Sequence, residues 1–200
     1  MTDTDICNMA LSEFGKGTIA SMEEGVETAR ACKLFYEPTR RELLREFPWG
    51  FAHRLERLAV VDREVPGWTY AYGYPDRCLK VNKIVAQTPH YGHYEPFDIV
   101  NIGSSTKVIV SNLEEAYADF IWDAKDPALF DDIFIQAFAH LLASKMAMRL
   151  TGNPQISQQE YQLHKMAIQS AQLQDAREAH TEPQFFSNYI RARQGRYGHE

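Results

Sequence analysis

The chain is 200 residues long, 44% of them hydrophobic and 12% aromatic, with a formal net charge of −6 at pH 7. This length and composition are enough to bury one sizeable core, or one core with a small satellite. The negative charge argues against a general nucleic-acid binder, because phosphate binding needs clustered lysines and arginines.

The cysteines and the N-terminus indicate the compartment. Cys7, Cys32 and Cys78 lack the CxxC spacing of a zinc site, and isolated thiols favour a reducing compartment over a disulfide framework. The first ten residues are acidic rather than typical of a signal peptide, and no run of about 18 apolar residues occurs. We therefore expect a soluble protein that is made in the cytoplasm and needs no cofactor.

Two helices are predicted before residue 52. Apolar residues at helical spacing favour a short helix, capped by Thr4 or Asp5 and ending near residue 14, and a longer helix over residues 21–47. Pro38 falls inside the longer helix, where it removes a backbone donor and clashes with the preceding turn. We therefore expect a kink or a restart at that point.

The pattern then changes to short β-strands separated by clusters of Gly and Pro. Such strands with tight breaks predict an antiparallel sheet or a small sandwich, inserted between two helical halves of the chain. The predicted strands cover residues 55–61, 68–74, 79–86, 97–102, 107–110 and 117–122.

A helical hairpin is predicted over residues 126–150 and 154–179. Its first helix carries one broad apolar stripe, with Asp126 and Pro127 as start signals and Gly152 as the stop signal. The outer face of the second helix is rich in Gln, Ala and Ser and has little charge. Two interpretations of that face stay open, an ordinary solvated surface and a contact between subunits.

These segments together predict an α+β fold, a helical bundle with an inserted antiparallel β domain and an extended C-terminal arm. We divide the chain into N-terminal helices of the bundle (1–51), the inserted β-rich domain (52–125), the C-terminal helical hairpin (126–180) and the arm (181–200).

The arm combines four aromatic residues with three arginines, unlike a typical disordered tail. Both residue types are enriched in binding hot spots. We favour an arm that docks on a partner over a tail that packs on its own domain or is frayed. The residues that carry this hypothesis are Phe185, Phe186, Tyr189, Arg191, Arg193, Arg196 and Tyr197.

Carboxylates accumulate before the hairpin, with seven between residues 112 and 132 against the single cation Lys125. A solvated strand edge and a helix N-terminus both favour negative charge, and we prefer that explanation. The alternative is an acidic wall that repels passing nucleic acid. The wall would consist of Glu114, Glu115, Asp119 and Asp123.

No residue pattern indicates catalysis or a metal site. His90 and His93 with Glu95 have a metal-like spacing, but they fall in a predicted hairpin loop without a further marked ligand, so we interpret them as loop residues. GxSxG, Walker, dinucleotide-binding and HExxH patterns do not occur. We expect the three tryptophans, Trp49, Trp68 and Trp122, to fill the core and the domain corners.

Several ordered segments resemble the head-to-tail adaptors of short-tailed bacteriophages, also called tail tubular protein A or head-completion connectors. The resemblance spans nearly the whole chain to about residue 180, and no single motif decides it. The segments are residues 5–11 (DICNMAL), 29–36 (ARACKLFY), 43–52 (LLREFPWGFA), 68–79 (WTYAYGYPDRCL) and 126–131 (DPALFD), with 150–152 (LTG) after the long helix.

The resemblance implies a structural role in the virion, at the head–tail junction. Adaptors of this family form a dodecameric ring under the portal protein, extend the DNA channel, help retain the genome and hold the next tail or nozzle protein. Double-stranded DNA passes through the ring without sequence-specific binding. The family's C-terminal segment reaches the portal, so the docking role is carried over to the arm. We expect a non-enzymatic chain that is monomeric when free and assembles on the portal.

Two other classes compete with this hypothesis. One is a peptidoglycan-degrading, muramidase-like enzyme, because a phage injection machine must cross a cell wall. Glycoside hydrolysis needs two carboxyl groups that flank a cleft, which the sequence does not mark. The other is a soluble ligand-binding protein, which would have a deep apolar pocket beside the tryptophans. Lysis of peptidoglycan by the purified protein would distinguish the enzyme.

Overall fold

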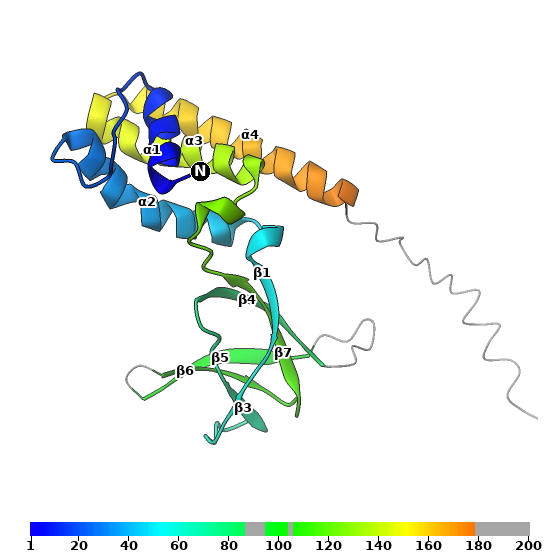
Figure 1. Ribbon diagram of the computed structural model, residues 1–200. Helices are drawn as coiled ribbons and strands as arrows, with labels where there is room; N and C mark the ends of the chain where they lie inside the picture. Colours follow the sequence, from blue (N-terminus) through cyan, green and yellow to red (C-terminus); the bar gives the residue numbers. More distant parts are fainter. Residues whose placement is uncertain (87–94, 104–105, 179–200) are drawn as a thin grey trace, which may run out of the picture.

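The computed structural model describes residues 1–86, 95–103 and 106–178. In that part of the chain, four α-helices form a bundle, and antiparallel sheets project from one side of it (Figure 1). The strands enter the chain between the second and third helices. The predicted α+β fold, a helical bundle with an inserted antiparallel β part, is therefore confirmed. The predicted arm lies outside the described residues.

Helix α1 (Asp3–Ser12) begins with a reciprocal cap. The Thr2 hydroxyl accepts a hydrogen bond from the Asp5 backbone N–H (3.2 Å), and the Asp5 carboxylate accepts one from the Thr2 N–H (2.7 Å). The predicted cap at Thr4 or Asp5 was wrong, because the N-cap is Thr2. Tyr36 fixes α1 to the next helix by donating a hydrogen bond to Asp3 (2.7 Å).

Helix α2 (Glu27–Glu46) begins later than the sequence predicted. The preceding residues are held as a loop, because the Glu24 carboxylate accepts the backbone N–H groups of Ala20 (2.6 Å) and Ser21 (3.0 Å). The helix continues through Pro38 without a break, so the predicted restart was wrong. Packing of α2 against the rest of the bundle keeps the helix continuous, because most helical stability in proteins comes from tertiary contacts.

The third helix begins later than its predicted start at residue 126. Asp126 does cap a turn with Pro127 at its first position, but the turn is a short 3₁₀-helix, η2 (Pro127–Leu129). Phe130 then adopts an extended backbone and buries its ring against Phe51 and Phe134. Helix α3 consequently spans Asp132–Thr151 rather than starting at residue 126.

Helix α3 is the centre of the bundle. Its C-cap, Gly152, has φ of +68°, the left-handed conformation predicted for this stop. Helices α1, α2 and α4 (Pro154–Glu178) all pack on α3. The predicted single stripe was wrong, because α3 is buried around most of its circumference. Its buried residues are Phe134, Ile135, Ala137, Phe138, Ala139, Leu141, Leu142, Ala143, Ser144, Met146 and Ala147.

The β part is a small sandwich of two antiparallel sheets. One sheet has the order β1-β7-β4 and the other β2-β3-β6-β5. Side chains of both sheets, such as Tyr72, Ile84, Ile109 and Phe120, form the core between them. The strands are β1 (His53–Arg57), β2 (Val60–Val61), β3 (Tyr70–Gly73), β4 (Cys78–Ala86), β5 (Phe97–Ile102), β6 (Thr106–Ser111) and β7 (Ala116–Trp122).

The strand predicted over residues 55–61 divides between the two sheets. Strand β1 pairs with β7, whereas β2 pairs with β3 in the other sheet. The chain crosses at Leu58, whose side chain is buried in the sandwich core and whose N–H donates to the Ala116 carbonyl (2.8 Å). The predicted positions of β4 to β7 agree with the structure to within two residues.

Candidate functional site

The outer face of α4 is a charge-poor surface on the bundle. Exposed residues recur along it at alternating spacings of four and three, which places them in one line on the helix. We call this line the α4 seam. It consists of Gln155, Gln159, Gln162, Met166, Gln169 and Leu173.

Two residues of the seam are large, apolar and well exposed, Met166 (63%) and Leu173 (64%). The charged groups nearby are engaged within the chain. Lys165 binds Glu46 of α2 (2.7 Å), and the buried Glu160 lies 2.9 Å from His140 of α3. The seam is therefore a neutral strip of amides and apolar side chains, a composition suited to packing against another helix.

A shallow groove of about 500 Å³ lies beside the seam, between α3 and α4. Exposed Tyr161 (42%) and Met148 (56%) are among its lining residues, together with Glu42 and Lys145, which form an ion pair. The apolar surface therefore extends from α4 onto the neighbouring helix.

The junction between the bundle and the sandwich depends on a buried cation, Arg40 of α2. Its Nη1 lies 2.7 Å from the Asp123 carboxylate just after β7 and also donates to the Ala124 carbonyl, and its Nη2 lies 2.7 Å from Glu37. Burial alone would lower the pKa of Arg40, but the hydrogen bonds to the Glu37 and Asp123 carboxylates raise it. The guanidinium thus stays charged and links α2 to the end of the sandwich.

Asp119 is a buried carboxylate with several partners, as Arg40 is a buried cation, and it lies on the outer face of the three-stranded sheet. Its carboxylate accepts from His53 Nε2 (2.7 Å) and Asn82 Nδ2 (3.1 Å), and Lys83 Nζ lies 3.5 Å away. Its side chain is 10% exposed. Asp119 therefore acts as an acceptor that joins strands β1, β7 and β4.

The structure separates the four residues of the predicted acidic wall. Asp119 and Asp123 are buried and balanced by cations of the same chain, and Glu115 pairs with Arg57 on the surface (2.8 Å). Glu114 is exposed. The acidic wall stays a prediction. Its two buried residues, Asp119 and Asp123, form ion pairs within the chain. Sequence reasoning missed these pairings because the partners are far apart in the chain.

The residues of the predicted docking arm lie outside the described part of the chain. His90 and His93, which have a metal-like spacing in the sequence, also lie outside it. The prediction for the arm therefore stays a prediction. The structure does describe the preceding element, α4, whose C-terminal end extends beyond the other helices of the bundle (Figure 1).

The tryptophans differ in their surroundings. Trp49 is buried at the corner between α2 and the sandwich, where its indole donates to the Leu43 carbonyl (3.0 Å) and packs edge-on against Phe134. Trp122 lies under the Arg54 guanidinium. Trp68 lines an open groove of about 790 Å³ along the loop before β3. The core role predicted for Trp49 is confirmed.

Comparison with models of known protein families gives no match, and comparison with curated proteins gives no match either. Within the described residues, no helix is both long and apolar enough to span a membrane.

Proposed function

We propose that the chain is a head-to-tail connector of a short-tailed bacteriophage. It would assemble as a ring under the portal protein, extend the DNA channel, help retain the genome and hold the next tail protein. The proposal starts from the ordered resemblance in the sequence. The fold supports it, because the resemblance implies a helical bundle joined to a β-rich domain and the structure has a helical bundle with an inserted sandwich.

The α4 seam is the observation that carries the proposal furthest. A ring of identical chains needs two different surfaces that meet in a head-to-tail manner. We assign the α4 seam as one of these surfaces, with a neighbouring copy of the chain as its occupant. The complementary surface would lie on another helix, and α2 offers the exposed apolar residue Leu34 (53%), with Val26 (47%) at its N-cap.

Glutamine side chains suit a contact that forms late. Amides can hydrogen-bond across a helix pair or to water at similar cost, so a seam with two apolar residues stays soluble in the free chain. This agrees with the expectation of a monomer in solution that oligomerises on the portal. The arm, residues 181–200, would then supply the contact with the portal itself.

The proposal is tested by placing charge on the seam. The double variant Met166→Lys/Leu173→Lys puts two like charges in each subunit contact, and we expect at least a tenfold loss of ring formation on isolated portal. The matched control is Leu55→Lys/Val60→Lys, which adds the same charge at two exposed apolar positions of the sandwich, away from the seam and its groove. Co-sedimentation with the portal measures both.

One further variant separates the contact made by the arm from the contact made by the seam. A chain that ends at residue 180 should fail to bind the portal while keeping its thermal unfolding transition. Equal binding by both lysine variants would contradict the role of the seam, and unchanged binding by the truncated chain would contradict the role of the arm.

A further inference from the structure

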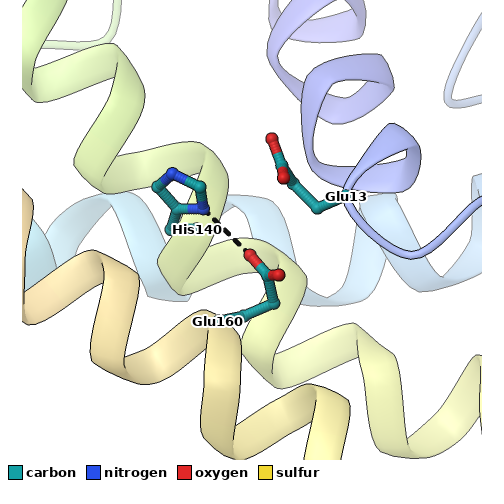
Figure 2. A group of neighbouring side chains, drawn as sticks. All are labelled: Glu13, His140 and Glu160. Carbon is teal, nitrogen blue, oxygen red and sulfur yellow. Dashed lines mark hydrogen bonds and ion pairs between the residues drawn. The ribbon is translucent and has the colours of Figure 1, made fainter.

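Three side chains from three helices form a cluster apart from the surfaces described above. Glu13 follows the last turn of α1, His140 lies in α3 and Glu160 lies in α4. Figure 2 shows the three side chains converging, and their ligand atoms all lie within 4.8 Å of one another. The cluster therefore joins the end of α1 to the α3–α4 hairpin.

The members of the cluster differ in burial. Glu160 has a side chain that is 3% exposed, and its carboxylate lies 2.9 Å from His140 Nδ1. His140 is partly exposed (21%), and Glu13 is on the surface. A carboxylate as buried as Glu160 needs compensating positive charge, because burial of an unpaired ion is costly.

A second histidine–glutamate pair in the same bundle shows what is different here. His164 is buried and lies 3.0 Å from Glu46, and Lys165 binds the same carboxylate at 2.7 Å. That cluster contains one carboxylate and a permanent cation. In the cluster of His140, the third member is the carboxylate of Glu13, so the group has net negative charge whether or not the imidazole is protonated.

The geometry points to a binding site for a divalent metal ion at Glu13, His140 and Glu160. Two ionised carboxylates and one neutral imidazole balance a charge of +2. A nitrogen donor with two carboxylate donors favours Zn²⁺ over Ca²⁺ or Mg²⁺, which prefer oxygen ligands throughout, and water would complete a tetrahedral site.

Binding requires small, specified changes. Zinc bonds of about 2.0 to 2.2 Å place neighbouring donor atoms about 3.3 Å apart in a tetrahedron. His140 Nδ1 and the Glu160 carboxylate lie 2.9 Å apart and must separate by a few tenths of an ångström, whereas Glu13 must approach by rotating its exposed side chain. A metal ion on Nδ1 needs the lone pair of that nitrogen, so the metal-bound imidazole would carry its single proton on Nε2, and any proton on Nδ1 would pass to solvent.

A metal ion at this position would act as a clamp on the bundle. It would fix the C-terminal end of α1 against the hairpin, and it would stabilise the native state because the three ligands come together only in the folded chain. This inference does not depend on the proposed function, since it rests on the bundle alone.

Zinc titration of the full-length protein tests the inference. We expect isothermal titration calorimetry with ZnCl₂ to show one site per chain, and the thermal midpoint to rise with zinc. Glu13→Gln should weaken binding at least tenfold and abolish the rise. Because Glu13 is exposed, this variant should fold even if His140→Ala or Glu160→Gln does not. The matched control is Glu56→Gln, an exposed carboxylate on β1.

A second control addresses the two histidines of the HxxH pattern. The variant His90→Ala/His93→Ala removes the HxxH pattern and should bind zinc as the parent does. The inference is overturned if the parent does not bind zinc, if Glu13→Gln binds it with unchanged affinity, or if His90→Ala/His93→Ala loses the site.

Discussion

The bundle and the sandwich are stabilised in different ways. The bundle surrounds α3 with apolar side chains on nearly all sides, so its helices are fixed by close packing. The sandwich has a smaller core, and buried carboxylates cross-link it outside that core, Asp119 within one sheet and Asp123 at the junction. Apolar packing therefore dominates in the bundle, whereas the sandwich adds buried ion pairs, and the Arg40–Asp123 pair reinforces a junction at which Leu79 and Ile121 also pack into the bundle core.

The largest effect should come from a cavity in the centre of the bundle. Phe138 of α3 is fully buried and packs against Tyr36 and Phe134. Phe138→Ala should lower the free energy of unfolding by about 3 to 5 kcal/mol, because it removes buried surface and leaves a void. Chemical denaturation followed by circular dichroism measures it. A loss below about 1 kcal/mol would mean that α3 is not the centre of the core.

Removal of the buried cation at the junction should have the next largest effect. Arg40→Met keeps an unbranched apolar stem but removes the guanidinium and so leaves Asp123 and Glu37 without their main partner, and we expect the free energy of unfolding to fall by about 3 kcal/mol. Limited proteolysis should also cut the junction near residue 124 faster than in the parent, because the sandwich is no longer tied to α2.

The matched control for Arg40 is its neighbour Arg41. Its Nε lies 3.7 Å from the same Asp123 carboxylate, but its side chain is 56% exposed, so Arg41→Met should cost less than about 1 kcal/mol. Equal losses for the two variants would show that burial of the cation does not matter, against the difference drawn between the two regions.

The smallest predicted effect is a pH dependence within the bundle. Burial raises the pKa of Glu46, but the hydrogen bond from Lys165 and the charge of His164 outweigh it, so the pKa lies below its usual value. This contribution to stability is present above the unfolded-state pKa and is lost as the pH falls through the lower, folded-state pKa.

Glu46→Gln isolates that contribution. Denaturation midpoints of the parent should fall between pH 6 and pH 3, and the variant should lose less over the same range. A parallel fall for both proteins would assign the acid sensitivity to other carboxylates. His164 contacts acceptors with both ring nitrogens, since Nδ1 lies 3.0 Å from the Ala137 carbonyl and Nε2 lies 3.0 Å from the Glu46 carboxylate.

The sequence predicted what depends on local patterns. The α4 helix, the stop at Gly152 and strand β5 follow from periodicity and from turn residues, and they agree with the structure. The starts of α2 and α3 did not follow, because Glu24 and Phe130 act through a loop cap and a distant aromatic cluster.

The candidate sites also divide into one that local sequence predicts and one that depends on residues far apart in the chain. The neutral face of α4 was visible in the sequence, since it depends on composition along one helix. The cluster of Glu13, His140 and Glu160 was not, because its members come from three helices and no local spacing unites them. The sequence marked one of the three residues, because His140 interrupts an otherwise apolar stretch of α3.

Electron microscopy of the purified chain mixed with its portal protein tests the central claim most directly. The account predicts single subunits in the absence of the portal and a closed ring of subunits beneath each portal ring after mixing. Portal rings that stay bare at saturating concentrations of the chain would contradict the account, and lysis of peptidoglycan by the same preparation would favour the enzyme instead.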